Sequence, residues 1–482
     1  MVFVPLRRGK LVEIKQSRVS EWLRSLAVDA ILEHCTERMG DDTGRVQEVL
    51  AKARELKGLP MEDVAVLCGI TTPDMTEALF AAAREVKEEI YGHRMVLFAP
   101  LYISNICGND CAYCAFRSSN KALPRTALDR EGIRRDTLEL VRQGHKRLLL
   151  VAGEGYAASS GGFDYILGAI HTVYDVTEAH GHIRRLNVNL APLHTEEFSQ
   201  LKEAGIGTYQ LFQETYHRET YSAVHLSGKK RDFDWRVTAF DRAMQAGIDD
   251  VGMGVLFGLT DWRFEILSLM QHIRHLESVF GVGCHTISVP RLEPADGSRL
   301  SVAPLAAVSD EDFKKIIAIL RLAVPYTGII LSTRESEAIR RECYALGVSQ
   351  ISAGSRTNPG GYSGDTQAAG QFQLGDHRSL DEVIQELAAM GFIPSFCTAC
   401  YRLGRTGQDF MDLAKPGLIK LKCDPNAVTT FQEYLMDYAS ASTRHIGEMA
   451  IDRELNTMGK EARRNAEKIR EHIRAGKRDV FC

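Results

Sequence analysis

The fold of this chain is decided by the stretch Ser104-Asn105-Ile106-Cys107-Gly108-Asn109-Asp110-Cys111-Ala112-Tyr113-Cys114, which directly follows an apolar run. Its three cysteines have the spacing C-x3-C-x2-C, so their thiolates can meet on one soft metal centre. Three thiolates cover three irons of a four-iron cluster and leave the fourth iron open. A zinc knuckle or a redox-active pair is the alternative, but zinc prefers four ligands and no fourth lies nearby. The spacing therefore favours an iron-sulfur cluster.

An open iron beside S-adenosylmethionine (SAM) is typical of the radical-SAM enzymes, and the loop resembles their signature. That signature has an aromatic residue before the last cysteine, here Tyr113. The resemblance implies that Cys107, Cys111 and Cys114 bind a 4Fe-4S cluster and that Tyr113 contacts SAM.

From about residue 94, short Val/Ile/Leu-rich runs alternate with helical patterns. The expected strands are 95–103, 147–153, 186–191, 208–214, 251–258, 285–291, 328–333 and 349–355. The helices expected between and after them are 129–142, 163–177, 195–204, 234–246, 262–280, 310–323, 335–346 and 379–390. Apolar strands separated by helices indicate a parallel sheet that is buried on both faces, and eight such units close a TIM-type barrel. The predicted fold class is therefore an α/β radical-SAM (β/α)8 barrel.

The barrel is expected to have an extension at each end of the chain. We divide the sequence into a helical N-terminal extension (1–93), the barrel (94–392) and a mostly helical C-terminal domain (393–482) that binds a second cluster. Within the last domain, residues 395–425 are expected to be loop-rich, and a charged surface helix is expected at 461–477. No low-complexity linker divides the chain, so we expect one compact body.

Polar residues after the barrel strands are the first candidates for the active site, because TIM-type active sites lie at the carboxyl ends of the strands. Ala152-Gly153-Glu154-Gly155 follows the second strand and is similar to the GGE motif of radical-SAM enzymes, with Ala152 in place of the first glycine. Gly153 allows close backbone approach, and Glu154 is suited to accept the amino group of the SAM methionine. A simple turn is the alternative.

Two further strands carry candidates. Gln213 and Glu214 end the fourth strand, where they could bind a ribose or a substrate amine, or could simply cap the following loop. Gly254 lies in a glycine-rich fifth strand and is assigned to the adenosine side of SAM, since glycines thin a strand where a cofactor approaches.

Arg334, after the seventh strand, is the first candidate for the carboxylate of an amino-acid substrate, with Ser352 as its helper. A guanidinium presents a bidentate fork that suits a carboxylate. Arg291, after the sixth strand, is the other arginine considered, and a structural ion pair is the ordinary role for either one.

A second cysteine set, Cys397, Cys400 and Cys423, has the spacing C-x2-C-x22-C. An isolated C-x2-C also fits a redox pair or half a zinc site, but a second three-cysteine set behind a radical-SAM barrel again indicates an open cluster iron. With 11 cysteines, six of them in these two groups, the sequence indicates metal binding in a reducing compartment rather than a disulfide scaffold. Core positions or the terminus are expected for Cys35, Cys68, Cys284, Cys343 and Cys482.

The charge pattern gives no sign of a nucleic-acid or membrane partner. The net charge is −4, and the sequence pI is about 6.4. The basic groups at 228–231 and at Arg463-Arg464 are interpreted as solvated faces. No apolar run approaches the roughly 20 residues that span a bilayer, and Met1-Val2-Phe3-Val4-Pro5-Leu6-Arg7-Arg8 lacks the apolar core of a secretory signal. We expect a cytoplasmic protein.

With both cysteine sets, the chain resembles the radical-SAM tyrosine lyases of FeFe-hydrogenase maturation. The likeness includes residues 88–92 (EEIYG), 205–209 (GIGTY) and 285–291 (HTISVPR). It implies SAM-dependent cleavage of L-tyrosine at Cα–Cβ to p-cresol and dehydroglycine, and conversion of dehydroglycine to CO and cyanide. It also implies a second 4Fe-4S cluster with a labile iron, bridged through free L-cysteine, on which an Fe(CO)2CN unit is built. The expected partners are a reductant such as ferredoxin or flavodoxin and the hydrogenase maturation proteins.

His285 opens the sixth strand and should therefore face the amino-end mouth of the barrel, opposite SAM. The family has an iron-binding histidine at this mouth, so the resemblance implies that His285 binds the labile iron, although a lone histidine is usually structural. Because the intermediate must cross the barrel, we predict a continuous internal cavity.

Three other functions stay open. The 2-iminoacetate synthases of thiamine biosynthesis share the barrel and tyrosine cleavage but lack the second cluster. An iron-sulfur carrier or scaffold is a non-enzymatic alternative, against which Glu154, Glu214 and Arg334 count. A zinc-stabilised structural protein needs four-ligand sites that the sequence does not supply.

Overall fold

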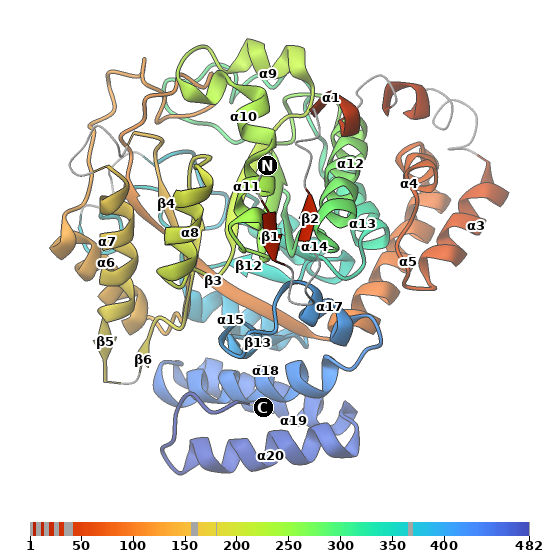
Figure 1. Cartoon of the computed structure of the whole chain (residues 1–482). Helices are drawn as coiled ribbons and strands as arrows, with labels where there is room; N and C mark the ends of the chain where they lie inside the picture. Colours follow the sequence, from red (N-terminus) through yellow and green to blue (C-terminus); the bar gives the residue numbers. More distant parts are fainter. Residues whose placement is uncertain are drawn as a thin grey trace.

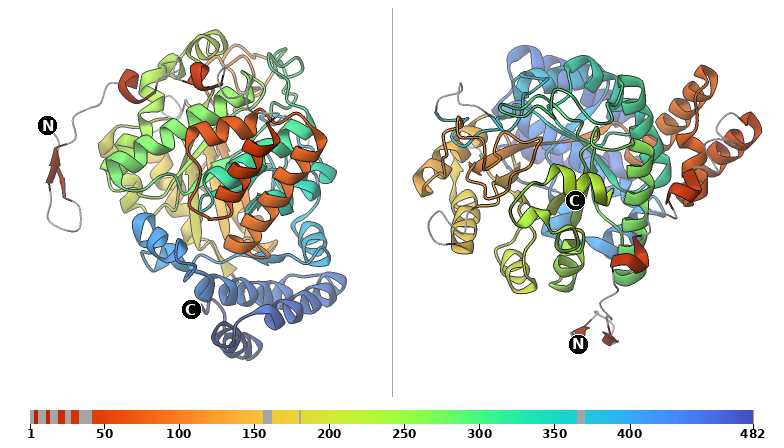
Figure 2. Two further views of the ribbon diagram at one scale, coloured as in Figure 1. Left: turned by 90° about the vertical axis from the view of Figure 1, so that its right-hand side faces the viewer. Right: turned by 90° about the horizontal axis from the view of Figure 1, so that it is seen from above.

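A closed barrel of parallel strands forms the centre of the protein. The computed structural model describes residues 3–5, 11–13, 19–23, 28–32, 42–155, 162–179, 181–364 and 370–481. The barrel strands are β3 (Arg94–Ser104), β4 (Arg147–Ala152), β7 (Arg185–Asn189), β8 (Tyr209–Glu214), β9 (Val251–Val255), β10 (Thr286–Ser288), β11 (Gly328–Leu331) and β12 (Gln350–Ser352). They pair in this order, and β12 pairs with β3 to close the sheet. The helices surround the strands (Figure 1), as the view from above also shows (Figure 2). The predicted TIM-type barrel is confirmed.

The strands form where the apolar runs predicted them. Each of the eight predicted runs overlaps one barrel strand, and β4, β9, β10, β11 and β12 are buried along their whole length. Residues of a strand that is covered on both faces must be apolar at successive positions, which is why these runs lack alternation.

The outer helices also follow the sequence pattern. They include α6 (Arg130–Arg142), α7 (Phe163–Asp175), α8 (Thr195–Glu203), α12 (Trp262–Phe280), α13 (Asp310–Ala323), α14 (Glu337–Leu346) and α15 (Leu380–Ala389). The helix predicted over 234–246 is instead two, α10 (Phe233–Val237) and α11 (Ala239–Gln245), separated by Thr238. The Thr238 hydroxyl donates to the carbonyl of Asp234 at 2.6 Å, a local bond that competes with regular helix geometry.

The N-terminal helices pack against one side of the barrel. They are α3 (Thr43–Ala53), α4 (Met61–Cys68) and α5 (Pro73–Tyr91), and α5 contacts α13 and α14. The description of residues 1–93 as helical is wrong for β1 (Phe3–Pro5) and β2 (Leu11–Glu13), which pair as antiparallel strands. Cys68, Cys284 and Cys343 are buried, whereas Cys35 and Cys482 lie outside the described residues.

The C-terminal elements lie at the amino end of the barrel (Figure 1). β13 (Ile393–Ser395) pairs with the start of β3, and α16 (Ala399–Arg402), α17 (Gly407–Ala414), α18 (Lys420–Asp437), α19 (Ala441–Thr457) and α20 (Lys460–Arg474) follow it. The loop-rich description of 395–425 is wrong for Cys423, which lies on α18. Pro425, inside that helix, is a residue more typical of a loop or helix start.

Of the two basic groups predicted to be solvated, the pair on the C-terminal helix α20 is exposed as expected. Arg463 and Arg464 on α20 are exposed, while the opposite face of α20 packs on α18. In the described part of the chain, no helix has both the length and the apolar character needed to span a bilayer.

Candidate active site and a second cysteine site

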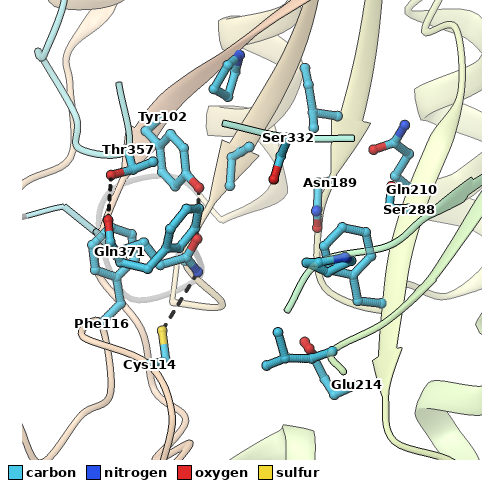
Figure 3. A pocket seen from close by; sticks show the side chains of 18 of the residues that line it. Tyr102, Cys114, Phe116, Asn189, Gln210, Glu214, Ser288, Ser332, Thr357 and Gln371 are labelled. Carbon is cyan, nitrogen blue, oxygen red and sulfur yellow. Dashed lines mark hydrogen bonds between the residues drawn. The ribbon is translucent and has the colours of Figure 1, made fainter. Parts of the chain in front are cut away.

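The first cysteine set lies on the loop after β3, at the carboxyl end of the barrel. Cys107, Cys111 and Cys114 are free thiols that line one cavity reaching into the barrel. The amide of Gln371 donates to Cys114 Sγ at 3.7 Å and accepts from the Tyr102 hydroxyl at 2.8 Å (Figure 3). Burial raises the pKa of Cys107 to about 11, so a bound metal, rather than the protein, would make it a thiolate.

Two glycines after β4 allow the next loop to lie directly on the cysteine loop. A Cβ at Gly153 would stand 2.5 Å from the carbonyl oxygen of Ile106, and one at Gly155 would stand 2.6 Å from it. The Gly108 N–H also donates to the carbonyl of Glu154 at 3.1 Å. The GGE-like motif therefore acts here through backbone contact with the metal loop.

Four charged side chains at this mouth form a paired group, which we call the cofactor-side quartet: Glu154, Arg236, Glu214 and Lys230. Arg236 Nη1 lies 2.9 Å from Glu154 Oε1, and Lys230 Nζ lies 2.7 Å from Glu214 Oε1. Arg236 Nη2 lies 3.6 Å from the same Glu214 oxygen, which joins the two pairs. Burial alone would raise the pKa of Glu154, but Arg236 and Lys230 outweigh it and lower that pKa.

The interpretation of residues 228–231 as a solvated face is wrong for Lys230, which points into the cavity. Its side chain is only 10% exposed and lines the cavity. Three backbone hydrogen bonds join residues 224–227 to the cysteine loop, and the Lys230 N–H donates to Asn109 Oδ1 at 2.9 Å. No local sequence pattern indicates Lys230 or Arg236 as site residues, because both reach the cavity only through the tertiary path of this segment.

Arg334 and Ser352 line the same cavity, as predicted for a substrate site. The Arg334 guanidinium stacks 3.3 Å from the centre of the Phe372 ring and forms no ion pair with any described residue. Burial lowers its pKa. Arg291, in contrast, is engaged by both carboxylate oxygens of Glu335 and by Asp310 at 2.8 Å, so it is structural.

Gln213 and Gly254, predicted to bind SAM, do not line this cavity. Side chains alternate along β8, so Phe212 and Glu214 face the cavity and Gln213 faces away from it. A Cβ at Gly254 would collide with the Phe212 ring, so this glycine makes room for a side chain rather than for a cofactor. Both assignments are corrected.

Tyr113 lines the cavity beside Cys114, as the signature implied. Its hydroxyl and His225 Nε2 are 2.8 Å apart, and His225 Nδ1 lies 2.8 Å from the carbonyl of Tyr221. Because that carbonyl can only accept, Nδ1 carries the proton and Nε2 accepts from Tyr113. His225 thus fixes the tyrosine ring.

The second cysteine set lies at the opposite mouth of the barrel. Cys397, Cys400 and Cys423 line a second cavity together with His285. His285 directly precedes β10, so it stands at the amino end as predicted, and its ring packs 5.3 Å from the Phe410 ring. The structure thus brings the four predicted metal ligands of this site to one cavity.

Four arginines surround the second cavity, and two of them, Arg147 and Arg185, are buried. Arg94, Arg147, Arg185 and Arg405 line it, and Arg185 pairs with Asp250 at 2.6 Å. A hydrogen bond from Cys400 and the charge of Arg94 lower the pKa of Cys423 to about 6. This positive environment favours thiolates and other anions.

The donor sets fit clusters better than a single metal ion. Among the described residues, no three Cys, His, Asp or Glu side chains converge in a group that could hold one ion. In a four-iron cluster each thiolate binds a different iron, so its cysteines surround a volume rather than a point. Three free thiols on one cavity wall satisfy that requirement at each mouth.

The two cavities are lined by adjacent layers of inward-facing positions in the barrel. On β3, Phe98 lines the first and Val96 the second; on β12, Ser352 and Gln350 are divided in the same way. No lining residue is shared between the two cavities. A continuous cavity that joins the two mouths stays a prediction.

Comparison with known proteins places these sites in context. Residues 101–270 match the Radical SAM superfamily, and residues 288–393 match the Biotin and Thiamin Synthesis associated domain. The 2-iminoacetate synthase of Salmonella typhimurium is 33% identical over 366 residues, which cover 76% of this chain and 94% of that protein.

Two solved structures are similar over almost the whole chain. A crystal structure of HydG, described as a maturase of the FeFe-hydrogenase, gives a TM-score of 0.92 at 46% identity and covers 96% of this chain and 100% of that one. HydG from Carboxydothermus hydrogenoformans gives a TM-score of 0.82 at 40% identity, with 94% and 100% covered. The likeness therefore includes the C-terminal elements as well as the barrel.

Proposed function

Because this chain belongs to the radical SAM superfamily, in the group that includes HydG and 2-iminoacetate synthase, we propose that it is a HydG-type tyrosine lyase. It cleaves L-tyrosine between Cα and Cβ to p-cresol and dehydroglycine. It then converts dehydroglycine to CO and cyanide and builds an Fe(CO)2CN unit for the FeFe-hydrogenase.

One observation carries this proposal: two sets of three free cysteines lie at opposite mouths of a single barrel, each in its own cavity. A lyase that only cleaves tyrosine needs one such site. A second set, with His285 beside it, is explained by a second chemical step on the fragment released in the first.

At the first mouth, this chain's residues bind and orient SAM and tyrosine. The cluster held by Cys107, Cys111 and Cys114 supplies, when bound, the electron that cleaves SAM into methionine and a 5′-deoxyadenosyl radical. Arg236 and Glu154 offer one cation and one carboxylate, which suit the charged ends of the SAM methionine. On the far side of the cavity, the unpaired Arg334 binds the tyrosine carboxylate, and Ser352 adds a hydroxyl.

At the second mouth, Cys397, Cys400 and Cys423 bind the second cluster. When bound, this cluster and a labile iron, held by His285 and free L-cysteine, supply the metal on which CO and cyanide are collected. The arginines around the cavity attract the anionic dehydroglycine and stabilise cyanide. The fragment then passes through the barrel from the first cavity to the second.

We further propose that the enzyme works in the reducing cytoplasm. A ferredoxin or flavodoxin would supply electrons, and hydrogenase maturation proteins would receive the product.

A 2-iminoacetate synthase-like lyase that releases dehydroglycine as iminoacetate is the second candidate. The similarity over 94% of the Salmonella typhimurium enzyme favours it. A carrier or scaffold role is less consistent with charged residues that line an internal cavity, such as Glu214 and Arg334.

Anaerobic reconstitution with iron and sulfide, followed by incubation with SAM, tyrosine and L-cysteine, tests the proposal. We expect about eight or nine irons per chain, together with p-cresol, CO and cyanide. Cys397→Ala should keep p-cresol and lose both diatomics, whereas Cys343→Ala, a buried cysteine that lines neither cavity, should keep all three products. Wild-type p-cresol without either diatomic would support the second candidate, and no SAM cleavage would support the carrier.

A further inference from the structure

Six charged side chains line the first cavity: Glu154, Glu214, Lys230, Arg236, Glu293 and Arg334. The first four are the cofactor-side quartet, whose two carboxylates and two cations satisfy one another. Glu293 and Arg334 remain. Neither residue forms an ion pair with any residue that the structure describes. The Glu293 side chain also forms no hydrogen bond with a described residue.

These two residues are of opposite charge and stand on neighbouring strand ends. Glu293 follows β10 and Arg334 follows β11, and the two strands are hydrogen-bonded in parallel. Each interacts electrostatically with the other across the cavity. A free amino acid carries the matching charges on adjacent atoms, a carboxylate and an ammonium on one Cα. An unpaired cation beside an unpaired carboxyl is therefore complementary to the backbone end of an amino acid.

On this basis, and resting on the proposed tyrosine-lyase function, we propose that Glu293 is a catalytic residue. It binds the α-ammonium group of tyrosine while Arg334 binds the carboxylate, and it removes one proton from the ammonium before hydrogen abstraction. The step balances: the N–H bond breaks, the proton moves to a Glu293 carboxylate oxygen, and the electron pair stays on nitrogen. The products are the neutral amine and the neutral carboxylic acid.

The surroundings of Glu293 suit a general base. Burial and the neighbouring Glu335 raise its pKa to about 7, and Arg334 and Arg291 oppose this rise. Asp310, at the start of α13, is the other charged group that faces it and also raises its pKa. A base titrating near neutrality combines the correct protonation state with useful basicity. Glu154, whose pKa is lowered by Arg236 and Lys230, is a poorer base.

The test is Glu293→Gln in the reconstituted holoenzyme, measured with tyrosine and with 3-(4-hydroxyphenyl)propanoate, which lacks the amino group. We expect about a 10²-fold lower rate of p-cresol formation near pH 7, typical for loss of a general base. That rate should rise with pH as tyrosine loses its own ammonium proton. In binding experiments, tyrosine should weaken while the amine-free analogue binds as it does to wild type. Glu293→Asp should partly restore the rate, and Glu219→Gln, an exposed change on α9 (Arg218–Val224), should behave as wild type.

Two results would overturn the assignment. One is an unchanged rate and pH profile in Glu293→Gln. The other is equal weakening of tyrosine and the analogue, which would show that the side chain only shapes the cavity. If wild type forms no p-cresol, the proposed function fails, and the difference between the two ligands in binding still decides whether Glu293 recognises an ammonium group.

Discussion

Gly153 lies so close to Ile106 that a Cβ on the glycine would stand 2.5 Å from the Ile106 carbonyl oxygen. Ile106 directly precedes the first cluster cysteine, so the loop after β4 sets the position of the metal loop after β3. Neither loop can shift without the other.

Gly153→Ala should therefore disturb cluster binding more than folding. The methyl group would push the backbone at Ile106 and Cys107, because the clashing atom is main chain and cannot rotate away. We expect loss of about four irons per chain on reconstitution and no SAM cleavage. Gly168→Ala on α7, where nothing lies within 4 Å of the added methyl group, should keep full iron content. Full iron content in Gly153→Ala would contradict this account of the motif.

Substitution of Arg334 should weaken substrate binding, whereas substitution of Arg291 should lower stability. Arg334→Gln removes a guanidinium that forms no ion pair with a described residue, so the melting temperature should hold while the KM for tyrosine rises about 10²-fold. Arg291→Gln leaves Glu335, which is 2% exposed, without its partner and should cost about 3 kcal/mol of stability. Thermal unfolding and p-cresol kinetics of the pair measure both effects. Binding of tyramine, which has no carboxylate, should be unaffected by Arg334→Gln.

Lys230 should contribute to SAM binding. Lys230→Gln leaves Glu214 with only the 3.6 Å contact to Arg236, and the freed carboxylate would repel the negative groups of the cofactor site. We expect about a tenfold higher Kd for SAM, measured by equilibrium dialysis. The exposed neighbour provides the control, Lys229→Gln, which should bind SAM as wild type does. Equal affinity for SAM in the two variants would show that Lys230 has only a structural role.

His285→Gln should affect only the second site. It stands at the amino-end mouth beside the second cysteine set and does not line the first cavity. The expected result is normal p-cresol formation with about one iron per chain fewer and a lower yield of CO and cyanide. His171→Gln, an exposed histidine on α7, is the matched control. Unchanged iron content and diatomic yield would remove His285 from the metal site.

Glu265 should make stability depend on pH. Burial raises its pKa from 4.5 to about 7 while it accepts hydrogen bonds from Thr215 and from the Tyr216 N–H, in the loop after Glu214. Because the folded-state pKa lies above the unfolded value, the folded protein favours protonated Glu265. The contribution of Glu265 to the free energy of unfolding is therefore fully present below pH 4.5 and is lost as the pH rises through about 7. Glu265→Gln should therefore gain about 2 kcal/mol relative to wild type between pH 5 and pH 8. Unfolding free energies at both pH values measure it, and a difference independent of pH would contradict the assignment.

The sequence by itself determined the barrel and both cysteine sets. Strands buried on both faces must be continuously apolar, and in each cysteine set at least two cysteines are two or three residues apart, so each feature leaves a local pattern. Glu154, Arg334 and Ser352 were found for a similar reason, since residues at the carboxyl ends of barrel strands meet at one mouth.

Only the tertiary structure decided the rest of the site. Gln213 faces away from the cavity because successive side chains of a strand point to opposite faces, and a bulge in β8 at this position shifts its register. Gly254 pairs with Phe212 and shares its inward face, but the Phe212 ring covers it. Lys230 and Arg236 entered the cavity because residues 224–230 fold back on the cysteine loop, which no local pattern records. The lack of an ion-pair partner for Glu293 and Arg334 among the described residues is visible only once the other four charges of the cavity are paired. The shapes of the two cavities also came only from the structure, because packing of inward side chains is a property of all eight strands together.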